Sequence, residues 1–326
     1  MTDAMIEFRH VKKNFGNDET IKDLSFKIKK GELFVLVGTS GSGKTTTLKM
    51  INQLYVQTDG DILFKGKRIK DYDLRSLRLD IGYVLQQIAL FPTMTVAQNI
   101  ALIPEMKKYP RTEIDKKIND LLKQVELDPE QYRDRYPNEL SGGEQQRIGI
   151  LRAIAAEPPL VLYDEPFSAL DPLVRTQLQD LVLKLHESTK STAVFVTHDM
   201  DEALKLGDRI GVMSNGDLLQ VDTPENIAQH PANDFVEEFF ADTINKNVFD
   251  TSIDKLFKTG FYIDNPHSDD VVVLENNTTL TEVFQALSEH QYVQIKDNRG
   301  KTICWTDRQE VMRFLGERSD VVHENK

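Results

Sequence analysis

The stretch that decides the fold reads Gly38-Thr39-Ser40-Gly41-Ser42-Gly43-Lys44-Thr45. It fits the pattern G-x-x-x-x-G-K-[ST], in which a glycine-rich loop turns successive backbone N–H groups toward phosphate oxygens. The apolar run Leu33–Val37 before it predicts a buried parallel strand. The stretch Thr45–Asn52 after it predicts a helix, whose positive end points at the same loop. Strand, loop and helix together predict a site for the phosphates of a nucleotide.

Each part of this loop has a chemical role. The three glycines let the backbone turn, Lys44 supplies a point charge for the outer phosphates, and the Thr45 hydroxyl is a magnesium ligand. An ordinary Gly/Ser-rich turn is the alternative, and the flanking strand and helix count against it. The candidate phosphate-binding residues are Gly38, Thr39, Ser40, Gly41, Ser42, Gly43, Lys44, Thr45 and Thr46.

A second apolar run, Leu160–Tyr163, ends in Asp164-Glu165-Pro166. Open α/β sheets bind ligands at the carboxyl ends of their strands, and these acidic residues are expected there. Asp164 can hold the magnesium ion through water, while Glu165 polarises the attacking water. Adjacent carboxylates at a strand end can also be plain helix caps, which is the alternative.

A third apolar strand, Ala193–Val196, is followed by Thr197-His198-Asp199. Asp199 and Glu202 have the spacing of a capping box for the next helix. This leaves His198 at the strand end, facing the phosphates, where it is expected to sense the γ-phosphate. A lone histidine is more often structural, and a structural role is expected for the other six: His10, His186, His230, His267, His290 and His323.

The segment Leu140-Ser141-Gly142-Gly143-Glu144-Gln145 predicts a second anion site. Ser141 and Glu144 form a capping box, and the Gly142 and Gly143 amides would lie at the positive end of the following helix. Nothing in the sequence requires both anion sites to bind one nucleotide within a single chain.

These motifs, in this order, resemble those of ATP-binding cassette (ABC) ATPases over roughly the first 240 residues. The resemblance implies a P-loop NTPase of the α/β class, with ATP and Mg²⁺ as cofactors. It also implies a head-to-tail dimer, in which Ser141–Glu144 of one copy closes over the nucleotide of the other. Ser168-Ala169-Leu170-Asp171 matches the loop that contacts the second copy. The commonest residue at position 144 of this pattern is Gln, and a carboxylate near the triphosphate can weaken closure.

The same resemblance assigns Phe15 to the aromatic ring that stacks on adenine, with a core aromatic as an equal alternative. It assigns Gln86 to the loop glutamine that reaches the metal and the attacking water. The stretch 93–150 lacks apolar strand runs and corresponds to the helical subdomain, which with Gln86 forms the groove for a permease. Its apolar residues Ile114, Ile118, Leu121 and Leu122 have helical spacing. The charge run Arg133-Asp134-Arg135 is expected to be solvated surface.

Composition agrees with this picture. A chain of 326 residues allows one large and one small domain, and a formal net charge of −12 argues against a nucleic-acid partner. A single cysteine, Cys304, excludes an intrachain disulfide and fits a reducing compartment. No signal peptide is expected, and no apolar run approaches the roughly 18 residues of a membrane helix. The resemblance therefore implies a peripheral subunit at the cytoplasmic face of the membrane, held there by a separate permease.

A polar linker is predicted over 241–250, after the cassette domain 1–240, and a small α/β domain over 251–326. In that domain, strands are predicted at Val271–Leu274, Tyr292–Ile295 and Lys301–Trp305, and helices begin at Thr279 and Asp307. The first helix carries Leu280, Val283, Phe284 and Leu287, and the last carries Val311, Phe314 and Leu315.

This β-α-β-β-α order resembles one cystathionine-synthase-type (CBS) repeat. Such repeats come as pairs that bind an adenine nucleotide, and a cyclic dinucleotide is a further candidate. Ile253–Ile263 is the only candidate for the other half, so the pair is degenerate or is completed by a second subunit. A dimerisation domain without a ligand is an equal alternative.

A cassette followed by such repeats is typical of the ATPases of quaternary-amine osmoprotectant importers. The stretches Gly41–Asn52 and Leu127–Pro137 resemble that group. The resemblance implies ATP-driven uptake of glycine betaine, carnitine or choline through a separate permease, fed by an extracellular binding protein. The alternatives are an importer ATPase for another small solute such as an amino acid, and a cassette ATPase outside transport.

Overall fold

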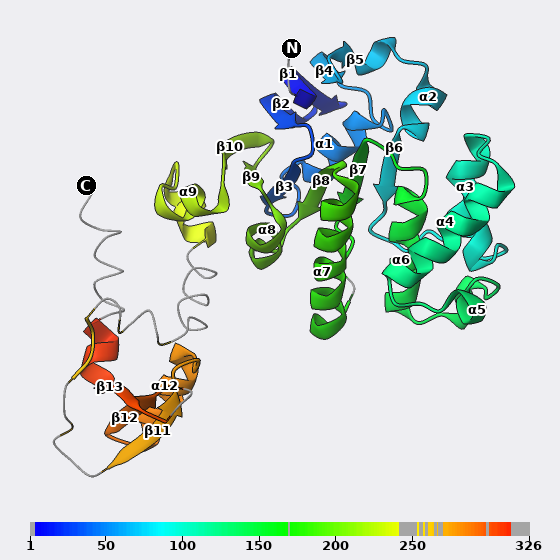
Figure 1. The fold of residues 1–326 in the computed structure, drawn as a ribbon. Coiled ribbons are helices and arrows are strands. Elements are labelled where there is room, and N and C mark those ends of the chain that lie inside the picture. Colours follow the sequence, from blue (N-terminus) through cyan, green and yellow to red (C-terminus); the bar gives the residue numbers. More distant parts are fainter. Residues whose placement is uncertain are drawn as a thin grey trace. The chain divides into compact units, whose positions relative to one another are not determined.

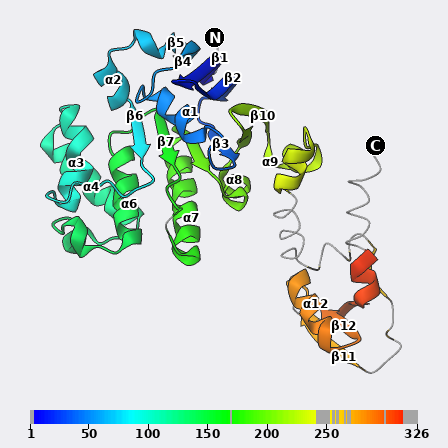
Figure 2. The same ribbon diagram turned by 180° about the vertical axis from the view of Figure 1, so that it is seen from behind.

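The computed structural model describes residues 4–168, 170–240, 253, 257, 260–263, 266, 270–297 and 300–313. Internal contacts divide the chain into two compact units, Met1–Glu237 and Glu238–Lys326. Figures 1 and 2 show them from opposite sides. The sequence predicted a division at residue 240, three residues from this one. The predicted linker, 241–250, lies outside the described residues.

A six-stranded sheet with the order β10-β9-β3-β8-β7-β6 forms the centre of the first unit (Figure 1). Its strands are β3 (Leu33–Gly38), β6 (Ile81–Val84), β7 (Leu160–Asp164), β8 (Thr192–Thr197), β9 (Arg209–Ser214) and β10 (Asp217–Asp222). All neighbouring strands pair in parallel except β9 and β10. Every residue of β3, β7 and β8 is buried, which explains their continuous apolar runs. Because these three strands are neighbours, the loops that follow them meet at one edge of the sheet.

A second, antiparallel sheet with the order β2-β1-β4-β5 was not predicted from the sequence. It consists of β1 (Ala4–Phe15), β2 (Asp18–Lys29), β4 (Asp59–Phe64) and β5 (Lys67–Arg68). Phe26 of β2 stacks between Phe8 of β1 and Phe34 of β3, with ring centroids 4.6 and 5.5 Å apart. Helix α1 (Lys44–Ile51) buries Leu48 in the same core. This shared core fixes the strand before the phosphate loop and the helix after it.

Helices surround the central sheet. The group α3 (Val96–Met106), α4 (Arg111–Gln124), α5 (Pro129–Tyr132) and α6 (Gly142–Ile154) lies beside the β6 edge in both views (Figures 1 and 2). The stretch predicted to be helical, 93–150, contains these helices and no strand, and α6 continues to Ile154. The four predicted apolar positions of α4 are its buried residues. Further helices are α2 (Leu74–Leu79), α7 (Pro172–Thr189), α8 (Met200–Leu206) and α9 (Pro224–Gln229), and residues 234–240 are also helical.

The charge run at 133–135 is more than solvated surface, so that prediction was wrong. Arg133 forms an ion pair with Asp115 at 3.0 Å and donates to Asn119 at 3.3 Å, both on α4. The Arg133 and Arg135 carbonyl oxygens accept backbone N–H groups from the start of α3 at 2.9 Å. The run joins two helices of the group, because its backbone and side chains supply partners for both.

The second unit contains β11 (Val271–Glu275), α12 (Leu280–Glu289), β12 (Tyr292–Lys296) and β13 (Thr302–Thr306). The sheet has the order β11-β12-β13, with β11 parallel to β12 and β13 antiparallel to it. The predicted Thr279–Glu282 capping box is present, and residues 308–313 are helical. Phe314 and Leu315 lie outside the described residues, as do 254–256, 258 and 259 within the predicted stretch 253–263. This unit has its own core: Ile253, Phe261, Leu280, Val283, Leu287, Val293, Ile295, Cys304 and Val311.

None of the described helices is both long enough and apolar enough to cross a lipid bilayer.

Candidate nucleotide site

The phosphate loop lies between β9 and β2, and two of its glycines have no room for a side chain. A Cβ on Gly38 would lie 2.0 Å from the Met213 carbonyl oxygen. Gly43 has φ 98°, and a Cβ there would lie 2.4 Å from Ile21 Cδ1. Gly43 is the N-cap of α1 and contributes no side-chain cap, so the free N–H groups of the first turn face the loop. The loop therefore has the backbone of an anion site.

Lys44 is 4% exposed, and its ammonium group lies against the backbone of the loop. It donates to the carbonyl oxygens of Gly38 and Thr39 at 2.8 Å each, and to Ser42 Oγ at 3.4 Å. Burial lowers the pKa of Lys44, and the negative charge of Glu165 opposes that shift. The loop thus holds a positive charge beside the N-terminus of α1.

Both carboxylate oxygens of Asp164 accept hydroxyl groups. Thr45 Oγ1 donates to Oδ1 at 2.8 Å, and Tyr83 Oη donates to Oδ2 at 2.9 Å. Burial and the charge of Asp164 raise the pKa of Tyr83, so its hydroxyl stays a donor. This role of Tyr83 was not predicted from the sequence. Its position near the end of a strand was visible, but its partner follows from strand pairing, since β6 lies beside β7.

The Thr45 and Asp164 oxygens fit a magnesium ion. Mg²⁺ binds through one or two carboxylates together with hydroxyl, water and phosphate oxygens. Here a hydroxyl and a carboxylate oxygen lie 2.8 Å apart beside the phosphate loop. Within the described ranges, no group of three or more His, Cys, Asp or Glu side chains is placed to hold a metal.

Glu165 and His198, predicted from two separate strands, lie together. His198 Nδ1 is 3.1 Å from Glu165 Oε2. The strands before them are paired neighbours, with Asp164 opposite Val196, and this register brings the two side chains into contact. Glu165 has φ 43°, in the left-handed region, where strain concentrates at functional sites. Its backbone N–H donates to the Val196 carbonyl at 3.0 Å, which holds this conformation.

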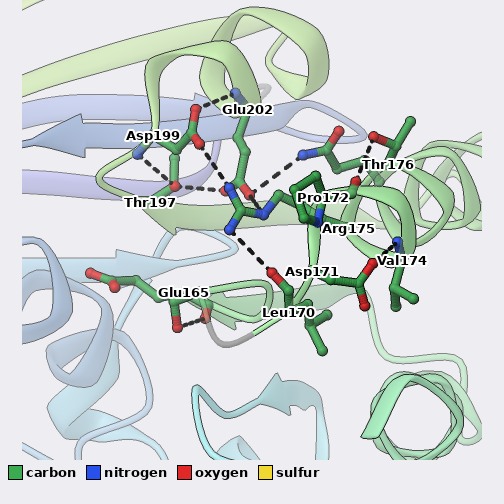
Figure 3. Close-up of polar contacts among 12 residues, drawn as sticks. Glu165, Leu170, Asp171, Pro172, Val174, Arg175, Thr176, Thr197, Asp199 and Glu202 are labelled. Atoms are coloured by element: carbon green, nitrogen blue, oxygen red, sulfur yellow. Dashed lines mark hydrogen bonds and ion pairs between the residues drawn. The ribbon is translucent and has the colours of Figure 1, made fainter.

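The predicted capping box of Asp199 and Glu202 is only half formed. Asp199 Oδ1 accepts the Glu202 N–H at 3.2 Å, so Asp199 caps α8. The Glu202 carboxylate turns inward instead, where it accepts the Thr197 hydroxyl at 2.7 Å and Gln179 Nε2 at 3.4 Å (Figure 3). It is 4% exposed, and burial raises its pKa. The Glu202 carboxylate thus accepts the buried Thr197 hydroxyl, and the Asp199 N–H that would complete the box donates to Thr197 Oγ1 instead.

Phe15 and Gln86 are both exposed. Phe15 is 43% exposed, which rules out the core alternative. It meets Tyr55 edge-on at 5.2 Å, and the Lys13 ammonium lies 4.5 Å from its centroid. Gln86 lies in the loop after β6, the strand that also carries Tyr83.

The Ser141–Glu144 capping box is confirmed at the start of α6. Ser141 Oγ accepts the Glu144 N–H at 3.3 Å, and Glu144 Oε2 accepts the Ser141 N–H at 2.7 Å. Glu144 Oε1 accepts the Tyr132 hydroxyl at 2.7 Å, and this bond is the main reason that its pKa is lowered. Both oxygens of the unusual carboxylate are therefore engaged within the chain.

The starts of α6 and α7 lie against each other. A Cβ on Gly143 would lie 2.9 Å from Val174 Cγ1 of α7. Asp171 caps that helix by accepting the Val174 N–H at 3.0 Å. Among the described residues, Ser141–Glu144 form no hydrogen bond with the phosphate loop 38–46. Apart from Phe15 and Gln86, the structure thus groups the predicted residues into two clusters, one around Lys44 and Glu165 and one around Ser141 and Asp171.

Comparisons with known proteins agree on one family. The ABC transporter family model matches residues 21–168. The choline transport ATP-binding protein OpuBA of Bacillus subtilis is 52% identical over 236 residues, which cover 72% of this chain and 62% of the relative. The osmoprotectant import ATP-binding protein OsmV of Salmonella typhimurium is 38% identical, covering 98% of this chain and 83% of the relative. This chain thus spans only 62% of the length of some of its relatives.

A solved structure supports the same assignment. It is a dimeric ATP-binding cassette in a post-hydrolysis state, bound to ADP and Pi, with a TM-score of 0.61 and 34% identity. It covers 68% of this chain, and 99% of that cassette is matched. From sequence, site geometry and structure alike, this chain belongs to the ATP-binding cassette transporter family.

Proposed function

We propose that this chain binds ATP with Mg²⁺ and hydrolyses it to ADP and phosphate. The observation that carries the proposal is the Glu165–His198 pair beside Asp164, whose two oxygens are held by Thr45 and Tyr83. Bound Mg²⁺ would neutralise charge on the phosphates. In this proposal, Lys44 and the loop amides bind the phosphates, and Phe15 stacks on the adenine. Gln86 reaches the metal and the attacking water. Glu165 orients that water and accepts its proton. His198 holds Glu165 and contacts the γ-phosphate.

The active form in this proposal is a head-to-tail dimer. Ser141, Gly142 and Gly143 of one copy close over the nucleotide in the loop of the other, with Glu144 capping the helix and Asp171 contacting the second copy. The free N–H groups at the start of α6 and the neighbouring cap of α7 support this arrangement. The similar cassette with bound ADP and Pi is itself dimeric.

The proposed role is to drive import of a quaternary-amine solute such as glycine betaine, carnitine or choline. The support is the function for which the relatives are named: choline transport at 52% identity, and glycine betaine, carnitine and choline transport at 51%. The subunit would act at the cytoplasmic face of the membrane, bound to a permease that receives solute from an extracellular binding protein.

The proposed contact with the permease includes a hollow of about 520 Å³ between α2 and α3. Its lining is mainly apolar, and Leu74 and Met106 are 40% and 42% exposed. We expect Met106→Asp to abolish co-purification with the permease while the chain alone keeps its ATPase activity, because a charge in an apolar contact is costly to desolvate. Ile303→Asp, an exposed apolar residue of the second unit, is the control. Retained co-purification of Met106→Asp would exclude this surface.

The second unit is proposed to regulate transport through an adenine nucleotide or a cyclic dinucleotide, with dimerisation alone as the alternative. Its parallel β11-α12-β12 unit and separate core are compatible with one CBS-like repeat. Because one repeat is half of a paired site, ligand binding would require two copies.

Reconstitution tests the whole proposal. The chain and its permease in proteoliposomes should take up labelled glycine betaine, carnitine or choline only with internal ATP. Uptake of an amino acid instead would support the alternative solute, and ATPase activity with no permease partner would support a role outside transport. Absence of ATP hydrolysis in every preparation would contradict the enzyme itself.

A further inference from the structure

Arg175, in the first turn of α7, joins two loops of the proposed hydrolysis site without belonging to either (Figure 3). Its Nη2 donates to the Leu170 carbonyl oxygen at 3.4 Å. Its Nη1 donates to Asp199 Oδ2 at 3.2 Å. One guanidinium group therefore spans from the loop before α7 to the cap of α8.

Each of the two hydrogen-bond partners of Arg175, Leu170 and Asp199, is next in sequence to a residue of the proposed site. Leu170 precedes Asp171, which is proposed to contact the second copy. Asp199 follows His198, whose ring lies 3.1 Å from Glu165 Oε2. A shift of the loop at Leu170 would thus be passed to the backbone beside His198 through two hydrogen bonds from one rigid, planar group.

The surroundings of Arg175 make the contact specific to an arginine. The side chains of Arg175 and Asp199 are 30% and 28% exposed, and the buried Glu202 carboxylate lies 3.9 Å from Arg175 Nε. Hydrogen bonds from Thr197 and Gln179 hold the Glu202 carboxylate in place. The two carboxylates that face Arg175, those of Asp199 and Glu202, both lie at the start of α8. A lysine ammonium could balance these charges but could not present two donors in the same fixed fork.

One donor of this fork is unused. Arg175 Nε is buried and has no hydrogen-bond partner among the described residues, with Glu202 Oε1 beyond hydrogen-bond distance at 3.9 Å. An unpaired buried donor is costly, so a small displacement of the loop that brings Nε to Glu202 would be favourable. A movement of Arg175 Nε toward Glu202 would therefore add one hydrogen bond to this network.

We propose that Arg175 is a positioning residue that couples the loop of Ser168, Leu170 and Asp171 to His198, so that contact with the second copy aligns His198 and Glu165 for hydrolysis. This inference rests on the proposed ATPase function. It assigns Arg175 no contact with the nucleotide, since its partners are Leu170, Asp199 and Glu202.

The test is a double-mutant cycle in the full-length chain between Arg175→Gln and His198→Ala, with kcat and KM for ATP measured for each variant. Arg175→Gln should lower kcat by about 10-fold to 100-fold, as misplaced catalytic groups do, with KM within about 3-fold. In the His198→Ala background the same change should lower kcat by less than about 2-fold, because the effects of substitutions at coupled residues are not additive. An equal fold-decrease in kcat on Arg175→Gln, with His198 present and with His198→Ala, would overturn the proposal.

Two further variants separate positioning from stability. Arg209→Gln is the matched control, because Arg209 pairs with buried Glu32 at 3.0 Å and the two are 26% and 6% exposed, away from the loops. Arg175→Lys keeps the charge beside Glu202, and it should keep the parent melting temperature but not the parent kcat.

The outcomes are distinguishable. A parent kcat for Arg175→Lys, or equal losses of kcat and melting temperature for Arg175→Gln and Arg209→Gln, would show a purely structural role. If the parent chain hydrolyses no ATP, the proposed function fails, whereas a failed coupling in an active chain contradicts this inference alone.

Discussion

At the scale of single residues, the candidate site depends on side chains that are held before they act. Asp164 has a hydroxyl donor on each oxygen, and Glu165 is fixed by its backbone bond to Val196 and by its contact with His198. Preorganised groups of this kind stabilise a transition state without reorganising during the reaction. Substitutions of Glu165 and Lys44 should therefore separate hydrolysis from binding.

Glu165→Gln should keep ATP binding and lower turnover by about 100-fold or more, because an amide accepts a hydrogen bond but cannot take the proton of the attacking water. The closed dimer should accumulate with ATP. Phosphate release and size-exclusion chromatography measure these two effects. Glu187→Gln, an exposed carboxylate of α7, serves as the control. A Glu165→Gln protein that hydrolyses ATP at the parent rate would rule out the assigned role.

Lys44→Ala should weaken ATP binding itself, by about 10-fold or more, because charge-assisted hydrogen bonds to the phosphates are lost in the ground state. Titration calorimetry measures the affinity directly. Lys184→Ala removes an exposed positive charge from α7 and should leave the affinity unchanged. Unchanged ATP affinity in Lys44→Ala would contradict the phosphate role.

At the scale of elements, the start of α6 shows how an acidic residue can be accommodated in an anion site. Glu144 stands where Gln is commonest, yet the Tyr132 hydroxyl and the Ser141 N–H occupy its two oxygens. The Tyr132 ring in turn carries Arg135, whose guanidinium lies 4.4 Å from the ring centroid. Helix α5 therefore supplies a hydroxyl donor that holds one carboxylate oxygen, while the Ser141 N–H holds the other.

Tyr132→Phe should slow ATP hydrolysis by about 3-fold to 10-fold, because the released carboxylate is free to turn toward the triphosphate of the second copy. The same change in a Glu144→Gln background should have little effect, since the amide carries no charge. The measurement is the steady-state ATPase rate of the parent, Tyr132→Phe, Glu144→Gln and the double variant. Tyr109→Phe, which removes a hydroxyl that donates to the Ala156 carbonyl oxygen at 3.4 Å, is the control. An equal loss with Gln at position 144 would contradict this explanation.

At the scale of the whole molecule, the two units have separate cores. The core of the first contains Phe34 and Leu48, next to the phosphate loop, while that of the second is built around Leu287 and Val293. Separate cores make it reasonable to expect hydrolysis and regulation to be separable.

Removal of 247–326 should leave ATP hydrolysis by the chain largely unchanged and abolish control of transport by ionic strength or by an adenine-containing ligand. Uptake in proteoliposomes across a salt series, with and without nucleotide, measures both. Leu287→Asp in the full chain should give the same loss of control, because it places a charge in the core of the second unit. Identical salt responses of full-length and truncated protein would leave dimerisation as the role of this unit.

The sequence alone determined the features that depend on neighbouring residues. The glycines at 38 and 43, the capping boxes at Ser141 and Thr279, and the buried strands β3, β7 and β8 follow from backbone sterics, local hydrogen bonds and continuous apolar runs. The same local rule was wrong at Glu202, whose carboxylate turns to a buried hydroxyl instead of closing the box.

Only the tertiary structure decided which distant residues meet. Tyr83 and Thr45 reach Asp164 across 81 and 119 positions of sequence, because β6 pairs directly with β7 and α1 contacts β7. Arg175 reaches Asp199 across 24 positions, through the packing of α7 on α8. Strand order and helix packing set these contacts, and they minimise the free energy of the whole chain rather than of any one segment.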